Sequence, residues 1–172
     1  MIGTSGSGKS TFSSKLAEIL DVPHIELDAL FWKPDWAITA DEEFFPKIES
    51  RLAETDGWVL DGNYSRTTSL KWRYADMVIW LDYSFARTTY QVTKRALWRA
   101  WSQTEIWPGT GNTESWRKLL SRDGIIWWSV SSYKRVKVRY ETAFESDDYS
   151  HIIFVRLRSP DESERFLKSI AK

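Results

Sequence analysis

The 172-residue chain contains no cysteine, two histidines and no run of about eighteen apolar residues. Without cysteine, it forms no disulfide and offers no thiolate ligand to a metal. The two histidines, His24 and His151, are isolated and begin predicted strands, so we interpret them as structural rather than as a zinc site. The lack of a long apolar run argues against a membrane span. We therefore expect a cytoplasmic protein with no membrane partner.

The composition is that of a globular domain, with 42% hydrophobic and 28% charged residues. The length fits one domain with a single core, so we treat residues 1–172 as one unit. The net charge is zero but unevenly distributed. Residues 1–86 carry 8 Lys/Arg and 14 Asp/Glu, residues 87–139 carry 11 and 3, and residues 140–172 carry 5 and 7. The basic middle segment is either a phosphate-facing element or a solvated helical face.

Strand-like and helix-like segments alternate along the chain. Strands are predicted at residues 24–27, 57–62, 75–84 and 151–157. Helices are predicted at residues 10–22, 40–54, 85–101 and 159–172, and residues 114–146 form one or two further helices. This alternation predicts an α/β fold with a parallel sheet. Residues 100–146 have no predicted strand, so we interpret them as a helical lid insertion over one end of the sheet. Ser159 is the expected N-cap of the last helix.

Residues 3–10 read G-x-x-x-x-G-K-S, the phosphate-binding P-loop. Its glycines let the backbone approach a phosphate, and the following helix start supplies N–H groups. Lys9 adds a positive charge for the β- and γ-phosphates of ATP, and the Ser10 hydroxyl is placed to bind Mg²⁺. The predicted nucleotide-binding residues are Gly3, Thr4, Ser5, Gly6, Ser7, Gly8, Lys9, Ser10 and Thr11.

A P-loop follows the central strand of its sheet, yet only Met1 and Ile2 precede it here. We interpret Ile2 as the last residue of that strand, so we expect the first strand to be truncated and the natural chain to begin several residues upstream. Four or five missing apolar residues would remove roughly 6–15 kcal/mol of burial. We therefore expect a slot in the sheet between residues 58–61 and 77–81.

Acidic residues end three of the predicted strands. Asp61 is expected beside the P-loop, where a carboxylate orients Mg²⁺, although a helix or turn cap is the alternative. Asp28 is a candidate acceptor contact or base, and Glu26 is predicted on the same face of that strand. Asp82 is interpreted mainly as a helix cap, with a place near Mg²⁺ as the alternative.

Phosphoryl transfer needs positive charge around the moving group. Arg95 and Arg99, four residues apart on a predicted helix, are candidates for this role, and a solvated helix face is the alternative. The chain also has 11 tryptophans. Eight of them lie in the loop after the strand predicted at residues 24–27 or in and near the insertion: Trp32, Trp36, Trp98, Trp101, Trp107, Trp116, Trp127 and Trp128. We interpret most of these as packing residues, with stacking on a nucleobase as the alternative.

The stretch GWVLDGNYSRT at residues 57–67 resembles the G-x-x-x-D-G-F-P-R-T stretch of adenylate and other nucleoside-monophosphate kinases. With the P-loop, HIELDALFWKPDW, VIWLDYS and VRLRSPDESERFL, it is most similar to adenylate-kinase-like bacterial proteins labelled "topology modulation protein" (FlaR-like). The resemblance implies a nucleoside-monophosphate-kinase fold with sheet order 2-3-1-4-5 and a mobile lid. It also implies that Arg66 contacts substrate, although this arginine lies one residue later than in the kinases.

The sequence therefore favours an ATP- and Mg²⁺-dependent kinase. Lys9, Asp61, Arg95 and Arg99 are its predicted catalytic residues, Ser10 and Asp61 its metal ligands, and Asp28 and Arg66 its acceptor contacts. The acceptor is a small molecule, with a nucleotide or nucleoside as the leading class. The first alternative is a nucleic-acid-associated NTPase that uses the basic residues 87–139. The second is a nucleotide-binding protein without turnover.

Overall fold

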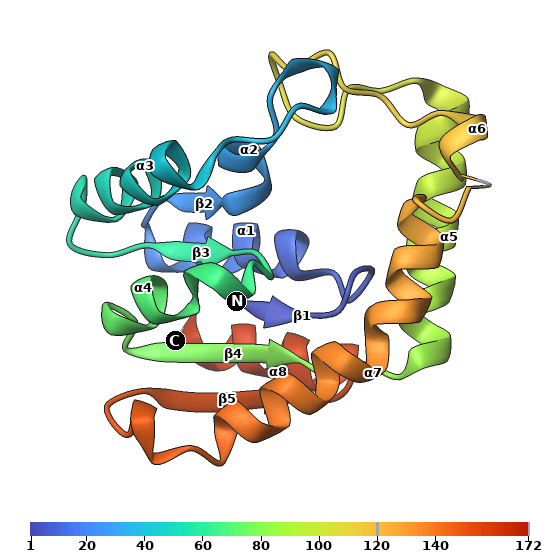
Figure 1. Ribbon diagram of the computed structural model, residues 1–172. Coiled ribbons are helices and arrows are strands. Elements are labelled where there is room, and N and C mark those ends of the chain that lie inside the picture. The colour runs from blue at the N-terminus through green and yellow to red at the C-terminus, as the bar shows by residue number, and fades with distance from the viewer. Residues whose placement is uncertain (120, 172) are drawn as a thin grey trace.

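The computed structural model describes residues 1–119 and 121–171 (Figure 1). Its strands are β1 (Ile2–Gly3), β2 (His24–Glu26), β3 (Val59–Asp61), β4 (Met77–Leu81) and β5 (Ile153–Leu157). Its helices are α1 (Lys9–Leu20), α2 (Leu27–Phe31), α3 (Asp41–Ala53), α4 (Thr68–Arg73), α5 (Phe85–Ser102), α6 (Trp116–Leu119), α7 (Ile125–Phe144) and α8 (Pro160–Ile170). The predicted alternation of strands and helices is confirmed, and every recorded strand pair is parallel.

The strands fall into two hydrogen-bonded groups, with orders β1-β4-β5 and β2-β3. Figure 1 draws β3 beside β1, where the Met1 amino group donates to the Leu60 carbonyl oxygen at 2.6 Å. No ladder of strand pairs is recorded across this junction within the described residues, so the continuous order 2-3-1-4-5 stays a prediction.

The slot expected between residues 58–61 and 77–81 corresponds to a small cavity beside the two-residue β1. The cavity is lined by Met1, Ile2, Trp58, Leu60, Lys71, Trp72, Ala75, Met77 and Val78. The Ile2 side chain is only 2% exposed, which places β1 in the interior of the molecule.

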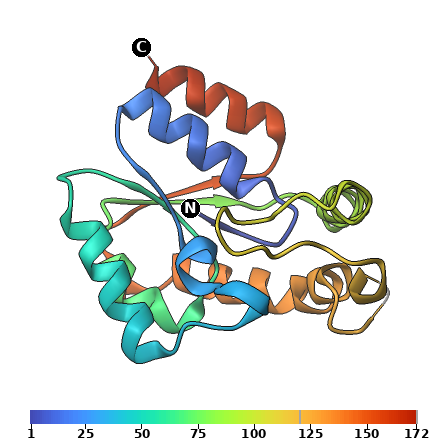
Figure 2. The same ribbon diagram turned by 90° about the horizontal axis from the view of Figure 1, so that it is seen from above.

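Helices cover both faces of the sheet (Figure 2). Helices α1 and α8 lie on one face, while α3, α4 and α7 lie on the other. Phe12 and Leu16 of α1 pack with Leu81 beneath the first layer. Trp80 of β4 packs with Tyr140 of α7 beneath the second. The strands β1 and β3 and most of β4 are therefore buried, and the nearly continuous apolar sequence of β4 predicts this, whereas β5 is partly exposed.

Helices α5 and α7 run side by side beyond the arrowheads of the strands (Figure 1). The buried residues of α5 are small, Thr88, Val92, Ala96 and Ala100, which lets the two helix backbones approach closely. The interpretation that most insertion tryptophans are packing residues is wrong for five of the eight. These five side chains are 50–76% exposed: Trp98, Trp101, Trp116, Trp127 and Trp128. Trp98 and Trp101 lie on α5, whose buried residues are the small ones, so these two rings are left on its exposed side.

Two local predictions have different outcomes. The Ser159 cap is confirmed, because its hydroxyl accepts from the backbone N–H of Glu162 at 3.2 Å. The expectation that Asp28 ends a strand is wrong, because β2 ends at Glu26 and Asp28 lies in the first turn of α2. The buried Leu27 and Phe31 pack with Phe44 and turn the chain into this short helix. Glu26 and Asp28 therefore do not share a strand face.

Candidate functional site

The P-loop joins β1 to α1 at the carboxyl end of the strand. Gly6 and Gly8 have φ angles of 80° and 84°, which lie in the left-handed region that favours glycine. A Cβ atom at Gly6 would clash with the carbonyl oxygen of Thr88 in α5. The loop therefore packs directly against the start of α5, and any side chain at position 6 would separate them. The predicted nucleotide-binding residues lie at the end of β1 (Gly3), in this loop and in the first turn of α1.

The amino end of α1 has no side-chain cap. Its N-cap is Gly8, which makes no side-chain hydrogen bond, so the first N–H groups of the helix remain available to an anion. The Lys9 ammonium donates to the carbonyl oxygen of Thr4 at 3.1 Å, within the loop. Burial lowers the pKa of Lys9, whereas the charges of Asp61 and Asp28 oppose this shift. Lys9 thus lies near both predicted carboxylates.

Asp61 ends β3 and is buried next to the P-loop. Burial alone would raise the pKa of Asp61, but His24, Ser10 and the charge of Lys9 outweigh it and hold that pKa below its ordinary value. The Nε2 atom of His24 lies 3.5 Å from Asp61 Oδ2, longer than a good hydrogen bond. Asp61 Oδ2 is buried and accepts no hydrogen bond, with the His24 ring beside it.

Asp28 faces the same region from α2. The Tyr64 hydroxyl donates to Asp28 Oδ1 at 2.7 Å. Burial raises the pKa of Asp28, although the hydrogen bond from Tyr64 and the charge of Lys9 act in the opposite direction. A carboxylate with a raised pKa is better suited to accept a proton near neutral pH.

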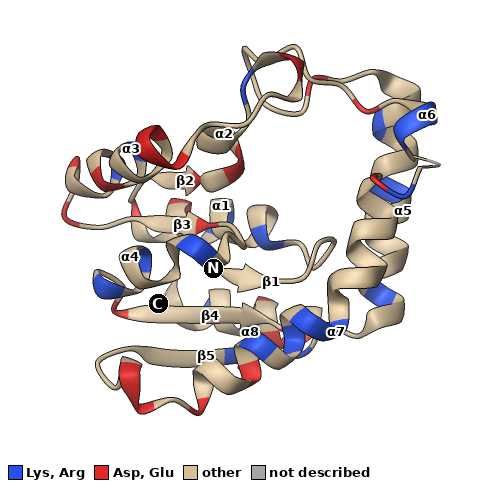
Figure 3. Ribbon diagram, in the orientation of Figure 1, with Lys and Arg blue, Asp and Glu red and all other residues tan. Residues whose placement is uncertain are grey.

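Arg95 and Arg99 approach from α5. Burial lowers the pKa of Arg95, and the charge of Arg99 lowers it further, whereas Asp28 opposes the shift. Burial also lowers the pKa of Arg99, with Glu114 and Glu26 opposing. The carboxylates of β2 and α2 therefore act on the pKa values of these guanidinium groups. The Arg95 residue nevertheless remains exposed to solvent. Figure 3 shows acidic residues on α3 and near β2 and basic residues on α5, α6 and α7, so the two signs of charge face each other across this region.

Arg66 lies at the edge of this region. Its Nε atom pairs with Asp41 Oδ1 at 3.1 Å, and its guanidinium carbon lies 5.1 Å from the ring centroid of Phe31. The side chain is therefore engaged with α3 and α2. Its predicted contact with the acceptor stays a prediction.

Asn63 is a residue of this region that the sequence did not single out. Its side-chain amide bonds both the N–H and the carbonyl oxygen of Gly3, and its Oδ1 also accepts from the Tyr140 hydroxyl at 2.9 Å. The Asn63 side chain thus makes with Gly3 the pair of hydrogen bonds that a neighbouring strand residue would make across the β3–β1 junction. Its bond to Tyr140 connects this junction to α7. The only signal in the sequence is that Asn63 stands where the kinase motif has Phe.

Helix α7 also contacts the phosphate-binding loop directly. The Ser129 hydroxyl donates to the carbonyl oxygen of Ser5 at 3.2 Å, and the Tyr133 hydroxyl donates to that of Tyr83 at 3.0 Å. Ser129 is only 2% exposed. The carboxyl half of the predicted lid is therefore packed on the P-loop and on the segment after β4.

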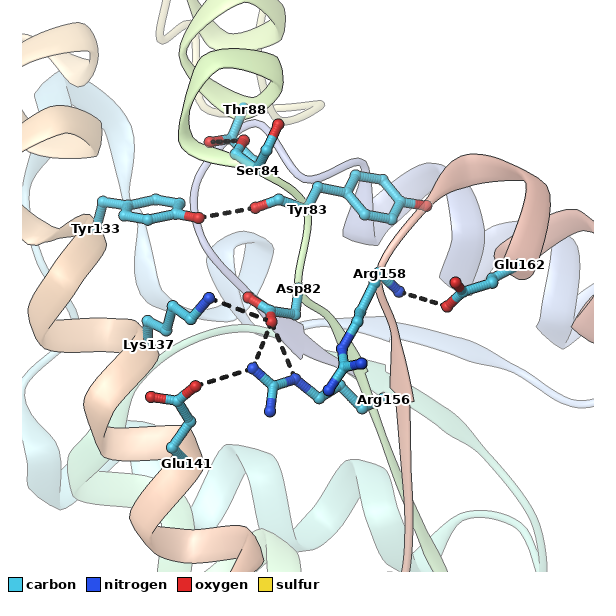
Figure 4. Close-up of polar contacts among 10 residues, drawn as sticks. All are labelled: Asp82, Tyr83, Ser84, Thr88, Tyr133, Lys137, Glu141, Arg156, Arg158 and Glu162. Carbon is cyan, nitrogen blue, oxygen red and sulfur yellow. Dashed lines mark hydrogen bonds and ion pairs between the residues drawn. The ribbon is translucent and has the colours of Figure 1, made fainter.

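Asp82 follows β4 and belongs to an ion-pair network (Figure 4). Its Oδ2 accepts from Arg156 Nη2 at 2.6 Å and lies 3.5 Å from Lys137 Nζ. The expectation that Asp82 caps α5 is wrong, because the Ser84 hydroxyl accepts from the N–H of Arg87 instead. The two cations draw the Asp82 carboxylate away from the helix start.

The described residues include no cluster of three or more His, Cys, Asp or Glu side chains that could hold a metal ion. Mg²⁺ bound with a nucleotide needs only one or two protein ligands beside the phosphates and water. The unpartnered oxygen of Asp61, close to Ser10, fits this requirement. Along residues 1–119 and 121–171, no helix is both long and apolar enough to cross a membrane.

The structure is that of a parallel α/β protein in which the P-loop sequence motif connects β1 to α1. No protein-family model and no curated protein matches the sequence. Among solved structures, the chain is similar to a gluconokinase from Sinorhizobium meliloti 1021, with a TM-score of 0.49 and 18% sequence identity over 99% of this chain and 90% of that one. A similarity of this size does not bear on the reaction of this chain.

Proposed function

We propose that the protein transfers the γ-phosphoryl group of ATP to a small molecule, with a nucleotide or nucleoside as the leading acceptor class. One observation carries the proposal: the buried Asp61, with its free oxygen, and Asp28, with its raised pKa, both lie near the P-loop lysine. The nucleotide class rests on the resemblance of residues 57–67 to nucleoside-monophosphate kinases.

On the donor side, the N–H groups of the P-loop and of the α1 start bind the phosphates. Lys9 leaves the Thr4 carbonyl oxygen and neutralises the β- and γ-phosphates. Arg95 and Arg99 add positive charge from α5, and their position opposite the P-loop supports a role on the transferred group. These groups act by positioning and by charge, which is most of what phosphoryl transfer requires.

Ser10 and Asp61 would hold Mg²⁺, which supplies charge neutralisation for the leaving phosphates when bound. Asp61 keeps its negative charge because its pKa is lowered. His24 contacts the same carboxylate and restricts its orientation.

On the acceptor side, Asp28 accepts the proton of an attacking hydroxyl or orients an acceptor phosphate through water. The Tyr64 hydroxyl holds Oδ1 of this carboxylate, which leaves Oδ2 for the acceptor. The attacking oxygen forms the new bond to phosphorus as the bond to the β-phosphate oxygen breaks.

A panel assay tests the proposal. ADP formation is measured with ATP and Mg²⁺ in the presence of nucleoside monophosphates, nucleosides, sugars and hydroxy acids. We expect acceptor-dependent turnover that Asp28→Asn lowers about 10²-fold or more. Glu49→Gln, an exposed carboxylate on α3, is the matched control and should have no effect. Turnover that no acceptor stimulates would refute the kinase assignment.

One observation favours a second candidate, a nucleic-acid-dependent NTPase. Helix α5 carries four basic and no acidic residues, and its exposed surface includes Tyr90, Trp98 and Trp101. Interleaved cations and aromatic rings are typical of surfaces that bind single-stranded nucleic acid. Stimulation of ATP hydrolysis by single-stranded DNA or RNA, with no effect of small acceptors, would support this candidate over the first.

A further inference from the structure

Two loops far apart in the sequence meet at the top of the molecule in Figure 1, one after α2 and one after α5. Their contact is made by Asn112. Its Oδ1 accepts from the backbone N–H of Trp36 at 2.9 Å, and its Nδ2 donates to the carbonyl oxygen of Lys33 at 2.9 Å. Asn112 itself is only 3% exposed, and both of its bonds are partly buried. We call this contact between residues 32–39 and 105–118 the clasp.

Aromatic packing reinforces the clasp. The Trp107 ring stacks on Trp32 with a centroid distance of 5.9 Å and an interplanar angle of 17°. Trp36 meets Trp107 edge-on at 5.8 Å, and Lys118 Nζ lies 3.5 Å from the centroid of the Trp36 ring. The three tryptophans of the clasp are thus the ones that act as packing residues.

The loop is held in a backbone conformation that side chains avoid. Asp35 and Trp36 have φ angles of 58° and 60°, both in the left-handed region that disfavours residues other than glycine. The N–H of Trp36, in the middle of this strained turn, is the group that Asn112 binds. Strain of this kind persists only where the surroundings impose it. Asn112 and the tryptophan stack are the groups that impose it here.

The strained loop is rigidly connected to the acceptor carboxylate. Thr39 N–H donates to the Phe31 carbonyl oxygen at 2.8 Å, and Lys33 N–H donates to that of Ala37 at 2.8 Å. These bonds close residues 31–39 into a hairpin directly after α2, the helix that contains Asp28. A displacement of the clasp is therefore transmitted to Asp28.

We propose that Asn112 is a positioning residue for the acceptor: it closes the clasp, fixes the strained loop and so sets the place of Asp28. The proposal rests on the proposed kinase function. With the clasp closed, the loop after α2 and the loop after α5 meet above the strands (Figure 1).

A spin-label experiment tests the clasp without turnover. Because the chain has no cysteine, Ala37→Cys and Pro108→Cys place one label on each loop of the otherwise unchanged protein. We expect a single narrow distance distribution by pulsed electron paramagnetic resonance, which Asn112→Ala broadens and shifts to longer distances. Thr113→Ala, the neighbouring residue, is the matched control and should leave it narrow. Asn112→Asp keeps the acceptor for Trp36 but loses the donor to Lys33. Its distance distribution should therefore be intermediate between those of the unaltered protein and of Asn112→Ala.

Kinetics with AMP as the phosphoryl acceptor test the positioning role. We expect Asn112→Ala to raise the KM for AMP roughly tenfold or more, with the KM for ATP changed by less than about twofold. Equal effects on both substrates would show a general loss of structure and overturn the positioning role. A narrow distance distribution in Asn112→Ala overturns the clasp whether or not AMP is phosphorylated. Absence of AMP turnover in the unaltered protein, with the distances as expected, counts against the proposed nucleotide acceptor alone.

Discussion

Lys71 is a buried cation whose protonation opposes folding. It lies in α4 with 4% exposure, and its ammonium donates to the carbonyl oxygen of Gly62 at 2.9 Å. Burial lowers the pKa of Lys71 from 10.5 to about 7, with the charge of Asp61 opposing and that of Lys9 adding to the shift. We therefore expect Lys71→Met to change the pH dependence of stability in a defined direction.

The sign follows from the protons bound in each state. Between pH 7 and pH 10.5, Lys71 is neutral in the folded protein but protonated in the unfolded chain, so raising the pH stabilises the fold. Below pH 7 both states are protonated, and the full penalty of the buried charge, about 5 kcal/mol, is present. Methionine removes the charge but leaves the Gly62 carbonyl oxygen without its donor, which costs about 1–3 kcal/mol.

Urea unfolding followed by circular dichroism at pH 6, 8 and 10 measures the difference. At pH 6 we expect Lys71→Met to be more stable than the unaltered protein by about 2–4 kcal/mol. The advantage should shrink as the pH rises and reverse near pH 10. Lys15→Met, on the exposed side of α1, is the control and should give a small difference at every pH. A Lys71→Met difference that is the same at pH 6 and pH 10 would refute the reasoning.

Four further outcomes are expected. Lys9→Ala should lower turnover about 10²-fold or more while circular dichroism shows that the protein remains folded, and activity above about a tenth of the original would remove Lys9 from the mechanism. Gly6→Ala should lower both the melting temperature and the affinity for a fluorescent ATP analogue more than Gly109→Ala does, because both glycines have positive φ but only position 6 has a carbonyl oxygen in the way. Asn63→Ala loses three hydrogen bonds and should destabilise the fold by roughly 1.5–4.5 kcal/mol, measured by urea unfolding, and a loss below about 0.5 kcal/mol would contradict the strand-like role of this side chain. Hydrogen exchange with and without a non-hydrolysable ATP analogue should change in residues 103–119 and 121–124 but not in α7, and equal changes in both would contradict the anchoring of α7.

The sequence predicts the parts of the fold that have a period or a motif. The apolar spacing in α1, the continuous apolar run of β4 and the Ser159-Pro160 start of α8 each identify one element without tertiary information. The short helices α2 and α4 are missed because five or six residues are too few to display a helical period. The helical conformation of α2 depends on packing of Leu27 and Phe31 against α3. A local sequence pattern does not contain this information.

The candidate site divides in the same way. The P-loop is predictable because its glycines, lysine and serine have fixed spacing. Asn63 and Asn112 are not, because a single asparagine in a loop has no pattern, and its role depends on backbone groups about sixty or more residues away in the chain. The tryptophans mislead for a related reason. Burial of a large ring depends on what lies opposite it, and α5 and α7 are sealed by small residues that leave no space for Trp98 or Trp101.

The predicted lid, residues 100–146, is anchored differently at its two ends. At the base, the Tyr140 hydroxyl of α7 donates to the Asn63 side chain, which in turn binds Gly3. The Ser129 hydroxyl of α7 donates to the Ser5 carbonyl oxygen. Helix α7 is therefore attached to the P-loop at Ser5 directly and at Gly3 through Asn63. At the tip, the two bonds of Asn112 hold the arm to a loop that is itself strained. A motion of the whole insertion would have to break the contacts at the base together with their buried packing. A motion of the tip breaks only the clasp and releases strain in doing so. The clasp is therefore the weaker of the two attachments, and opening on the proposed acceptor side requires no movement of α7 away from the P-loop.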